Sequence, residues 1–461
     1  MTIRSLKHLL SRPKGKLGEI WFRALITLLN WKLGSRPRWA TNEQIKTIRF
    51  SEVLGITSTI DIDRIYRKWR NADRIWDQGR YFDSVNMKRE VLQYLYSVQD
   101  TGGEKQVAPF MSFGWGHAIG HIGSLGTFTL GQKLGIIPSI RRYLPVKDES
   151  SRYLIGNFLR QEVSLVNSRL GYLTLENPSQ WHLSERLQMI NTGTEFISLY
   201  EMHELVFRDT RVTDGKVSLS LEASYVEFAE RQLRTLGLPS GAWFVGMHVR
   251  EKPNPLDPRL AKVETFYAAV TEIVSRGGWV IRFGADKMNP LPFRENVIDL
   301  NTDSEQYKKL HLYIIAKSLF LLTTNSGPSV LAWTLGTPVL QTNTLSIARN
   351  ILSSSKGSLF LPKKYRVSSD RPCSFSQIIS SNEGYAETSL KEKHSLGYQL
   401  LDNSEEEILR ATVDMFDYLK FGEHNTHLQK QVNEIRKSHG AVGYGTIAPS
   451  FLSQNEGWFL K

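Results

Sequence analysis

The residues with the clearest chemical potential lie where a short apolar segment ends. Residues 243–251 (WFVGMHVRE) have the pattern of a buried strand that closes with His248 and Arg250. Side chains two apart on a strand leave the same face, and open α/β sheets bind ligands at the carboxyl ends of their strands. An arginine there can donate forked, charge-assisted hydrogen bonds to phosphate. This segment therefore predicts a phosphate site at a strand end.

A second strand of the same kind follows one helix later. Residues 279–284 read WVIRFG, and a helix expected over 263–274 separates them from the first strand. In such a strand-helix-strand unit the two strands are parallel, so they end at the same edge of the sheet. We therefore expect Arg282 to lie near Arg250, where both face the same ligand.

Small polar residues precede a helix in the next predicted unit. Residues 324–329 read TNSGPS and lie between a strand expected at 318–323 and a helix at 330–335. Backbone N–H groups at the start of a helix bind anions, although a serine there more simply caps the helix. In combination with the two arginines, phosphate binding is the favoured interpretation. The predicted donor-binding residues are His248, Arg250, Arg282, Gly284, Asp286, Asn325, Ser326 and Gly327.

A glycine-rich segment in the first half of the chain predicts the acceptor side of a site. Residues 114–126 (GWGHAIGHIGSLG) follow an apolar run at 107–113, the expected first strand, and precede a helix expected over 127–134. Glycines let a ligand approach the backbone closely, but their spacing here is not that of a dinucleotide-binding turn. His117 and His121 are candidates for a general base, or they are surface histidines without a role.

The positive charge of the chain is concentrated near its beginning. The 461 residues carry a net charge of +12, and residues 1–40 hold nine basic residues and one acidic residue. The remainder is nearly neutral, which argues against a nucleic-acid-binding face on the folded body. Apolar residues between 17 and 33 recur at helical spacing, as in a basic helix that lies on an anionic membrane. A helix packed on the protein's own body explains the pattern equally well.

Two further helices are expected over residues 64–98, with a break at 79–81. They resemble one tetratricopeptide-like hairpin, and a single copy is expected to cap the next domain. Asp61 and Asp63 spell the DxD motif of metal-dependent sugar transferases. Acids at the start of a helix more often serve as caps, so we expect no metal site there.

Taken in order, the segments HVRE, VIRFG and TTNSGPSVLAWTLGTPVL resemble the donor half of a GT-B glycosyltransferase. The His-x-Arg strand end is similar to that of the fucosyltransferase-like group, and SGPSVLAWTLGTPV is similar to heptosyltransferase-type enzymes. The whole most resembles a bacterial family of glycosyltransferases from surface-polysaccharide clusters. The resemblance covers about residues 105–345, and no motif covers residues 346–461. It implies an α/β fold of GT-B type, in which two Rossmann-like domains face a cleft.

The resemblance also implies roles for particular residues. Arg250 and Arg282 would neutralise the donor diphosphate, with His248 shaping the same site. Residues 325–327 would hold a phosphate or the sugar, and the loop at 117–123 would face the acceptor. Heptosyltransferase-type enzymes carry an acidic residue in that loop, and this chain does not, so another residue must act as the base. The expected catalytic residues are His121, His117, Glu251 and Arg250.

These features predict a metal-independent, inverting glycosyltransferase of bacterial surface polysaccharide synthesis. Its donor would be a GDP- or UDP-linked sugar and its acceptor a glycan or a lipid-linked glycan, with no cofactor, no metal and no nucleic acid bound. Cys373 is the single cysteine, which fits a cytoplasmic protein, here attached to the inner membrane face through residues 1–40. The expected domains are a helical region (1–104), an acceptor domain (105–235), and a donor domain with C-terminal helices (236–461).

Two other functions remain open on the sequence. A non-catalytic adaptor would use the helical region to recruit partners and a degenerate nucleotide-sugar fold as its scaffold. The intact set of charged residues at the strand ends argues against such decay. A nucleotide-dependent oxidoreductase is opposed by the glycine spacing, and by Arg141 and Arg142 near the position where a dinucleotide site has an acid.

Overall fold

The computed structural model describes the greater part of the chain from residue 67 onward. The described residues are 67–69, 71–76, 78, 80–98, 113–116, 118–139, 142–146, 149–167, 189–251, 254–284, 288–293, 295–300, 305–348, 354–367, 371–384, 390–422, 426–439 and 445–460. By its internal contacts the chain divides into a unit of residues 1–67 with 176–178 and a unit that holds the rest. The elements named below belong to the second unit. No helix in the described residues has the length and apolarity to cross a bilayer.

Several predictions fall outside the described residues. They concern the basic segment 1–40, the acidic pair Asp61 and Asp63, and the site candidates His117 and Asp286. The run at 107–113, expected to be the first strand, also lies outside, apart from its last residue. That residue begins a short 3-10 helix, η1 (Phe113–Gly116).

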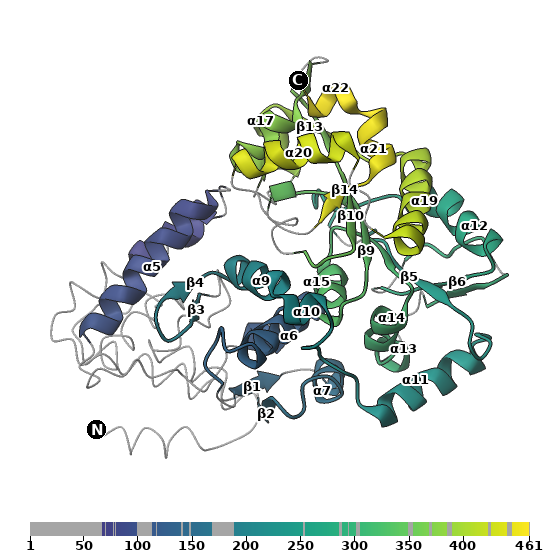
Figure 1. Cartoon of the computed structure of the whole chain (residues 1–461), viewed down its shortest axis with the longest axis horizontal. Coiled ribbons are helices and arrows are strands. Elements are labelled where there is room, and N and C mark those ends of the chain that lie inside the picture. Colours follow the sequence, from purple (N-terminus) through teal and green to yellow (C-terminus); the bar gives the residue numbers. More distant parts are fainter. Residues whose placement is uncertain are drawn as a thin grey trace, which may run out of the picture. The chain divides into compact units, whose positions relative to one another are not determined.

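A parallel sheet of seven strands forms the centre of the second half of the chain (Figure 1). Its strands are β5 (Phe244–His248), β6 (Trp279–Arg282), β7 (Val297–Asp299), β8 (Leu321–Thr324), β9 (Val339–Thr344), β10 (Ser358–Pro362) and β14 (Thr446–Ile447). Across the sheet they follow the order β14-β10-β9-β8-β5-β6-β7, and every neighbouring pair is parallel. The predicted α/β class is thereby confirmed.

The direction of travel across the sheet reverses between β5 and β8. From β5 the chain moves outward through β6 to β7, and it then crosses back to place β8 on the other side of β5. Connections that diverge in this way leave a crevice at the carboxyl ends of the two central strands. The residues that follow β5 and β8 therefore meet at the position where open α/β sheets bind ligands.

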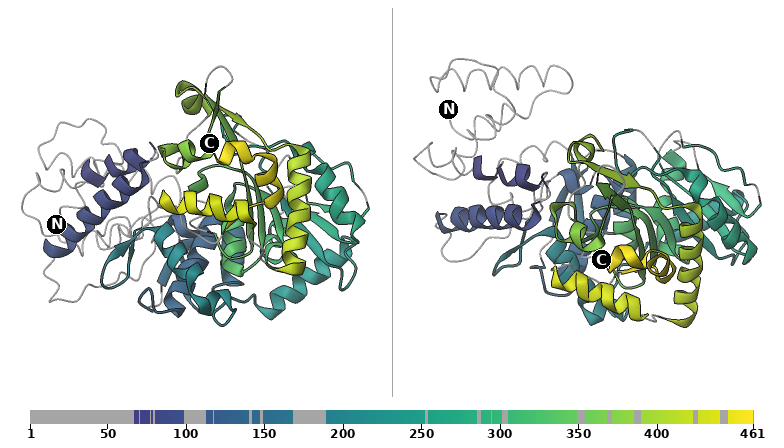
Figure 2. Two further views of the ribbon diagram at one scale, coloured as in Figure 1. Left: turned by 45° about the horizontal axis from the view of Figure 1, so that its top comes forward. Right: turned by 90° about the horizontal axis from the view of Figure 1, so that it is seen from above.

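Helices flank the sheet in two layers (Figures 1 and 2). Helix α12 (Tyr267–Ser275) packs against α19 (Glu405–Phe421), and α14 (His311–Lys317) packs against α15 (Gly327–Leu335). Strands covered on both faces are mostly apolar, and β8, β9 and β10 are buried throughout, although β9 also holds the buried polar residues Gln341 and Asn343. Before β8 the short helix α13 (Glu305–Lys308) precedes α14.

Residues beyond 345, where no motif was recognised, complete the same domain. β10 and β14 widen the central sheet, and three further strands form a small antiparallel sheet in the order β12-β11-β13. These strands are β11 (Lys364–Val367), β12 (Arg371–Cys373) and β13 (Tyr398–Leu401). The remaining helices are η3 (Val263–Phe266), α17 (Phe375–Ile379), η4 (Asn382–Gly384), α18 (Leu390–Ser395), α20 (His427–Ser438), α21 (Pro449–Gln454) and α22 (Glu456–Phe459).

The described part of the first half is a smaller α/β arrangement. Strands β1 (Arg142–Val146) and β2 (Val163–Asn167) are parallel and are joined through α7 (Glu149–Gly156), while β3 (Ile190–Asn191) and β4 (Phe196–Ile197) form a hairpin. The other helices are α6 (Ile119–Lys133), α9 (Leu199–Arg208), α10 (Thr210–Thr213) and α11 (Ala223–Thr235).

The two helices expected between residues 64 and 98 are present. Residues 71–76 are helical, and α5 (Tyr81–Val98) follows after the predicted break. Lys88 and Asp73 form a buried ion pair of 2.5 Å that joins the two helices. Arg89 donates a hydrogen bond of 2.8 Å to a backbone carbonyl of β4. The helical pair therefore packs on the first half, as the sequence predicted.

The glycine-rich segment 114–126 is not the turn that the sequence predicted. Helix α6 begins at Ile119, so most of these glycines lie inside a helix. A Cβ atom on Gly123 would lie 2.5 Å from the backbone nitrogen of Leu331, and one on Gly120 would lie 2.8 Å from Cα of Gly327. The glycines thus allow α6 and α15 to pack backbone against backbone, which offsets the roughly 1 kcal/mol that each costs a helix.

Candidate functional site

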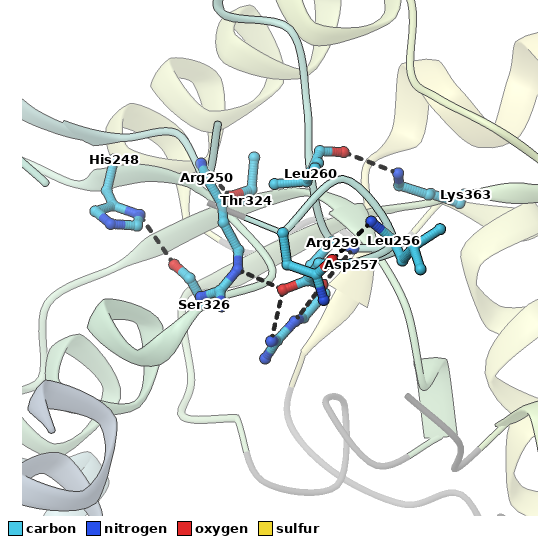
Figure 3. Close-up of polar contacts among 10 residues, drawn as sticks. His248, Arg250, Leu256, Asp257, Arg259, Leu260, Thr324, Ser326 and Lys363 are labelled. Atoms are coloured by element: carbon cyan, nitrogen blue, oxygen red, sulfur yellow. Dashed lines mark hydrogen bonds and ion pairs between the residues drawn. The ribbon is translucent and has the colours of Figure 1, made fainter. Parts of the chain in front are cut away.

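A cluster of polar residues lies where β5 and β8 end, at the reversal point of the sheet (Figure 3). His248 is the last residue of β5, and Arg250 follows two residues later, beyond the strand. Thr324 ends β8, and Asn325 and Ser326 connect it to α15. The sequence predicted His248, Arg250 and Ser326 for one site, and the structure brings them together.

His248 and Ser326 are joined directly. The Nδ1 atom of His248 lies 3.0 Å from Oγ of Ser326, which in turn lies 3.3 Å from Oγ1 of Thr323. Ser326 occupies the position that caps α15, but its hydroxyl does not accept a hydrogen bond from that helix. The alternative that Ser326 only caps the helix is therefore not what the structure shows.

The first turns of α15 and α6 have no side-chain cap, a feature they share with α11, α12 and α14. Helices α9, α17, α19 and α20 each begin with a reciprocal capping box. Neither Ser326 before α15 nor Ala118 before α6 provides a side-chain cap. Uncapped N–H groups at a helix start carry partial positive charge and bind anions. Neither of these two helix starts therefore has its N–H groups occupied by a cap side chain.

These two helix starts lie next to each other. A Cβ atom on Gly327 would lie 2.7 Å from the backbone nitrogen of Gly120, so the first turn of α15 touches the first turn of α6. Two turns further on, Oγ1 of Thr127 lies 2.8 Å from Oγ1 of Thr334. The part of the glycine-rich segment that was expected to face the acceptor thus contacts the segment after β8, and it does so as a helix and not as a loop. His121, next to Gly120, is partly buried.

The imidazole of His248 is uncharged at neutral pH. Burial, together with the nearby His311, Arg250 and Arg282, lowers its pKa to about 3. The ring of Phe283 lies between the two histidines, with its centroid 5.6 Å from that of His248 and 5.0 Å from that of His311. His248 therefore acts at this site as a neutral hydrogen-bonding group and not as a cation.

Arg250 is held at three points. Its backbone N–H donates to Oγ1 of Thr324 at 3.0 Å, and its carbonyl accepts from the backbone N–H of Ala261 at 3.0 Å. Its Nε donates to Oδ2 of Asp257 at 2.9 Å. In the described part of the chain, neither Nη atom of Arg250 donates to a protein acceptor, and the side chain is 30% exposed. Arg250 thus combines a fixed position with donors that a ligand can use.

Arg282 occupies a different environment from the one the sequence predicted. Its side chain is completely buried, pairs with Glu251, and lies 3.3 Å from a carboxylate oxygen of Asp299. The Glu251 carboxylate also accepts a hydrogen bond from the backbone N–H of Asn289 at 2.9 Å. An arginine enclosed by two carboxylates does not reach a ligand, and a carboxylate bound to it is not placed as a base. The predicted ligand role of Arg282 and base role of Glu251 are not supported here.

The other predicted residues have packing roles that are now visible. Oδ1 of Asn325 accepts a hydrogen bond of 3.0 Å from the backbone of Leu345, which ties the end of β8 to the segment after β9. A Cβ atom on Gly284 would lie 2.5 Å from Sδ of Met288 and 3.6 Å from the ring of His248. Gly284 therefore leaves the space in which the Met288 side chain lies, next to the His248 ring.

Asp257, Arg259 and Thr324 belong to this cluster and were not singled out in the sequence. Asp257 and Arg259 lie in and just after a proline-rich segment that connects β5 to η3 (Figure 3). An acid and a base two residues apart in a loop close to a strand-end arginine are the signal that was available. Lys363 also approaches this loop, donating at 3.1 Å to the carbonyl of Leu260.

A surface hollow of about 530 Å³ lies elsewhere, in the first half of the chain. It is lined by the end of α7 and the beginning of β2, including Arg152, Tyr153 and Arg160. Because ligands of open α/β sheets bind beyond the carboxyl ends of strands, a hollow at the amino end of β2 is on the wrong edge to serve the cluster at β5 and β8. Among the described residues, no group of three or more His, Cys, Asp and Glu is arranged to hold a metal ion.

Comparisons with known proteins give similarity at the level of solved structures. No protein-family model matches the sequence, and no curated protein matches it. The chain is similar to the glycosyl transferase family 9 protein of Veillonella parvula, with 14% identity, a TM-score of 0.39, and coverage of 66% of this chain and 96% of that one. It is also similar to the ADP-heptose LPS heptosyltransferase II of E. coli, with 12% identity, a TM-score of 0.40, and coverage of 67% and 97%.

Proposed function

We propose that the protein is a glycosyltransferase of GT-B type that uses a nucleotide-diphosphate-linked sugar. One observation carries this proposal: at the reversal point of the sheet, Arg250 has two Nη atoms without a partner among the described residues, it is tied to Thr324 just before α15, and the uncapped start of α15 adjoins that of α6. Such a set of donors suits an anion with two neighbouring phosphates. The two halves of the chain each contribute one helix start, as expected of a site between a donor domain and an acceptor domain.

The chemistry of glycosyl transfer explains why these groups suit the reaction. When the bond from the sugar to the diphosphate breaks, negative charge grows on the leaving phosphate oxygens. Arg250 and the amides at the start of α15 would stabilise that charge. Because their positions are fixed by the fold, little reorganisation would be needed in the transition state. His248, as a neutral imidazole bonded to Ser326, would donate or accept a hydrogen bond without adding charge.

The acceptor side belongs to the first half of the chain. His121 lies on the first turn of α6, beside the contact of Gly120 with Gly327. A histidine at that place would accept the proton of an acceptor hydroxyl as it attacks the sugar, which gives inversion at the anomeric carbon. His117 remains the second candidate for the base. A GDP- or UDP-linked donor, a glycan or lipid-linked acceptor, and attachment of residues 1–40 to the inner membrane face complete the proposal, in bacterial surface polysaccharide synthesis.

A panel of nucleotides tests donor binding directly. Only ligands that bind the folded state raise the melting temperature, by an amount set by affinity and concentration. We expect GDP or UDP to stabilise the protein, and the matching monophosphates, GMP and UMP, to stabilise it much less because they lack the second phosphate. A shift with NAD and none with the diphosphates would favour an oxidoreductase. No shift with any nucleotide at millimolar concentration would favour a non-catalytic scaffold.

A further inference from the structure

One carboxylate in the loop after β5 joins two arginines. Oδ2 of Asp257 accepts from Nε of Arg250 at 2.9 Å, and the guanidinium of Arg259 forms a two-point pair with Asp257, at 2.8 Å to each carboxylate oxygen (Figure 3). The Asp257 side chain is 10% exposed, against 30% for Arg250 and 29% for Arg259. The carboxylate is thus largely enclosed, while both arginines keep a face toward solvent.

The carboxylate is charged and held in one orientation. Burial raises the pKa of Asp257, but hydrogen bonds from the side chain and backbone of Arg259, and the charges of Arg259 and Arg250, outweigh it and lower the pKa to about 2. The backbone N–H of Arg259 donates to Oδ1 of Asp257 at 3.0 Å, which closes a short turn. A two-point arginine–carboxylate pair is more rigid than a single hydrogen bond. Arg259 therefore holds the Asp257 carboxylate in one orientation, and that carboxylate in turn binds Nε of Arg250.

The atom of Arg250 that Asp257 occupies decides which atoms remain for a ligand. Because Asp257 binds Nε, the outer edge of the guanidinium, which is formed by one N–H of each Nη atom, is left for a ligand. The backbone contacts of Arg250 with Thr324 and Ala261 set where its side chain begins. The contact with Asp257 sets the direction of its end. Without that contact, the long arginine side chain would populate several rotamers. A ligand would then have to order the side chain on binding, and the entropy lost would lower the affinity.

We propose that Asp257 is a positioning residue, which turns the two Nη atoms of Arg250 toward the donor diphosphate and is itself held by Arg259. This inference rests on the proposed function, because it takes the ligand of Arg250 to be a diphosphate. It does not rest on which sugar or nucleotide is bound. Asp257 does not touch the ligand.

Charge and geometry make opposite predictions for this residue. Loss of a negative charge beside an anion site strengthens the attraction for an anion. Loss of a positioning contact weakens binding, because the Arg250 side chain then loses conformational entropy when the ligand binds. A weaker affinity after removal of the Asp257 carboxylate is therefore the result that only positioning explains.

The experiment measures the affinity of the full chain for inorganic pyrophosphate, GDP and UDP by titration calorimetry. The variants are Asp257→Asn, which keeps the shape, Asp257→Ala, and Arg259→Lys, which keeps the charge but cannot form the two-point pair. The matched control is Asp402→Asn, since Asp402 also pairs with a cation beside this loop, at 2.6 Å from Nζ of Lys363. The melting temperature of each variant shows whether it is folded.

We expect Asp257→Ala to weaken pyrophosphate binding at least tenfold, with smaller losses for Asp257→Asn and Arg259→Lys. Asp402→Asn should remain within about twofold of the original protein, or bind slightly more tightly, because it changes charge alone. Unchanged or tighter binding by folded Asp257 variants overturns the positioning role and leaves the proposed function intact. An equal loss in Asp402→Asn also overturns it. If the original protein binds neither pyrophosphate nor any nucleotide, the proposed function fails, and the inference fails with it.

Discussion

Arg250 and Arg282 follow neighbouring parallel strands, yet the fold places them in opposite environments. Arg250 lies beyond the end of β5, has one carboxylate partner on Nε and is 30% exposed. Arg282 ends β6, has two carboxylate partners and is completely buried. The difference arises from the sheet. β5 borders the reversal point, where the connections diverge. β6 lies between β5 and β7, and Arg282 of β6 is in register with Asp299 of β7.

The comparison teaches that an arginine at a strand end is a candidate ligand only where the sheet leaves space beyond it. Buried charges need partners, and Arg282 is surrounded by acids from both neighbouring strands or their continuations. We therefore expect changes at Arg282 to affect the folding of the protein and changes at Arg250 to affect ligand binding.

The largest effect is expected for Arg282→Met. This variant leaves Glu251 and Asp299 without the cation they share, and breaking a buried ion pair by removing one partner costs about 3–5 kcal/mol. Urea unfolding should show that loss in the free energy of unfolding. Adding Glu251→Gln should recover part of it, because one unpaired buried charge is removed. If Arg282→Met folds as stably as the original protein but fails to bind nucleotides, the contrast between the two arginines is wrong.

For Arg250→Ala we expect the opposite result, a large loss of ligand affinity with little change in the stability of the protein. Affinity for the nucleoside diphosphate that the panel identifies should fall by about a hundredfold, which corresponds to about 2.7 kcal/mol. The free energy of unfolding should change by less than about 0.5 kcal/mol, since the side chain is partly exposed. Arg231→Ala is a suitable control, because Arg231 is an exposed arginine of α11 that pairs only loosely with Glu227. Undiminished affinity in Arg250→Ala would remove Arg250 from the site.

A smaller effect is expected where the two halves pack through glycines. Gly123→Ala places a methyl group 2.5 Å from the backbone of Leu331, so α6 and α15 must move apart. Overpacking of this kind costs about 1–3 kcal/mol. Gly156→Ala is the control, since nothing lies within 4 Å of a Cβ atom there. Thermal or urea unfolding measures both. Equal stabilities of the two variants would contradict the close packing of the helices.

The smallest effect concerns pH and extends the comparison to two histidines. His203 is buried on α9, and in the described part of the chain neither ring nitrogen has a hydrogen-bond partner, whereas His248 is bonded to Ser326. Burial lowers the pKa of His203 to about 3. The unfolded chain therefore takes up a proton below about pH 6.5 that the folded chain refuses, and stability falls as the pH falls from there toward 3.

The loss of stability at low pH that His203 causes can be measured. Between pH 6.5 and pH 5 the linkage of one such histidine amounts to about 1.6 kcal/mol. His203→Leu removes it and keeps an apolar side chain, so the variant should lose less stability than the original protein over that interval. Urea unfolding at the two pH values tests this. An identical pH dependence in both proteins would show that His203 is protonated in the folded state.

Some features of this protein follow from the sequence alone. Apolar segments of strand length alternate with helical periods, and this local pattern determines the α/β class and the positions of β5, β6, β8, β9 and α15. The pairing of His248 with Arg250 beside the TNSGPS segment follows as well, because parallel strands end at one edge.

Only the tertiary structure decided which of these residues a ligand can reach. The spacing of the glycines between 114 and 126 suits a loop or a helix face equally, and the backbone of α15, more than two hundred residues away in sequence, decided in favour of the helix. Likewise, Arg250 and Arg282 look alike in their segments. The strand order brings Glu251 and Asp299 to Arg282. The loop after β5 brings Asp257 to Arg250. Neither arrangement can be recognised from the residues near each arginine in the sequence.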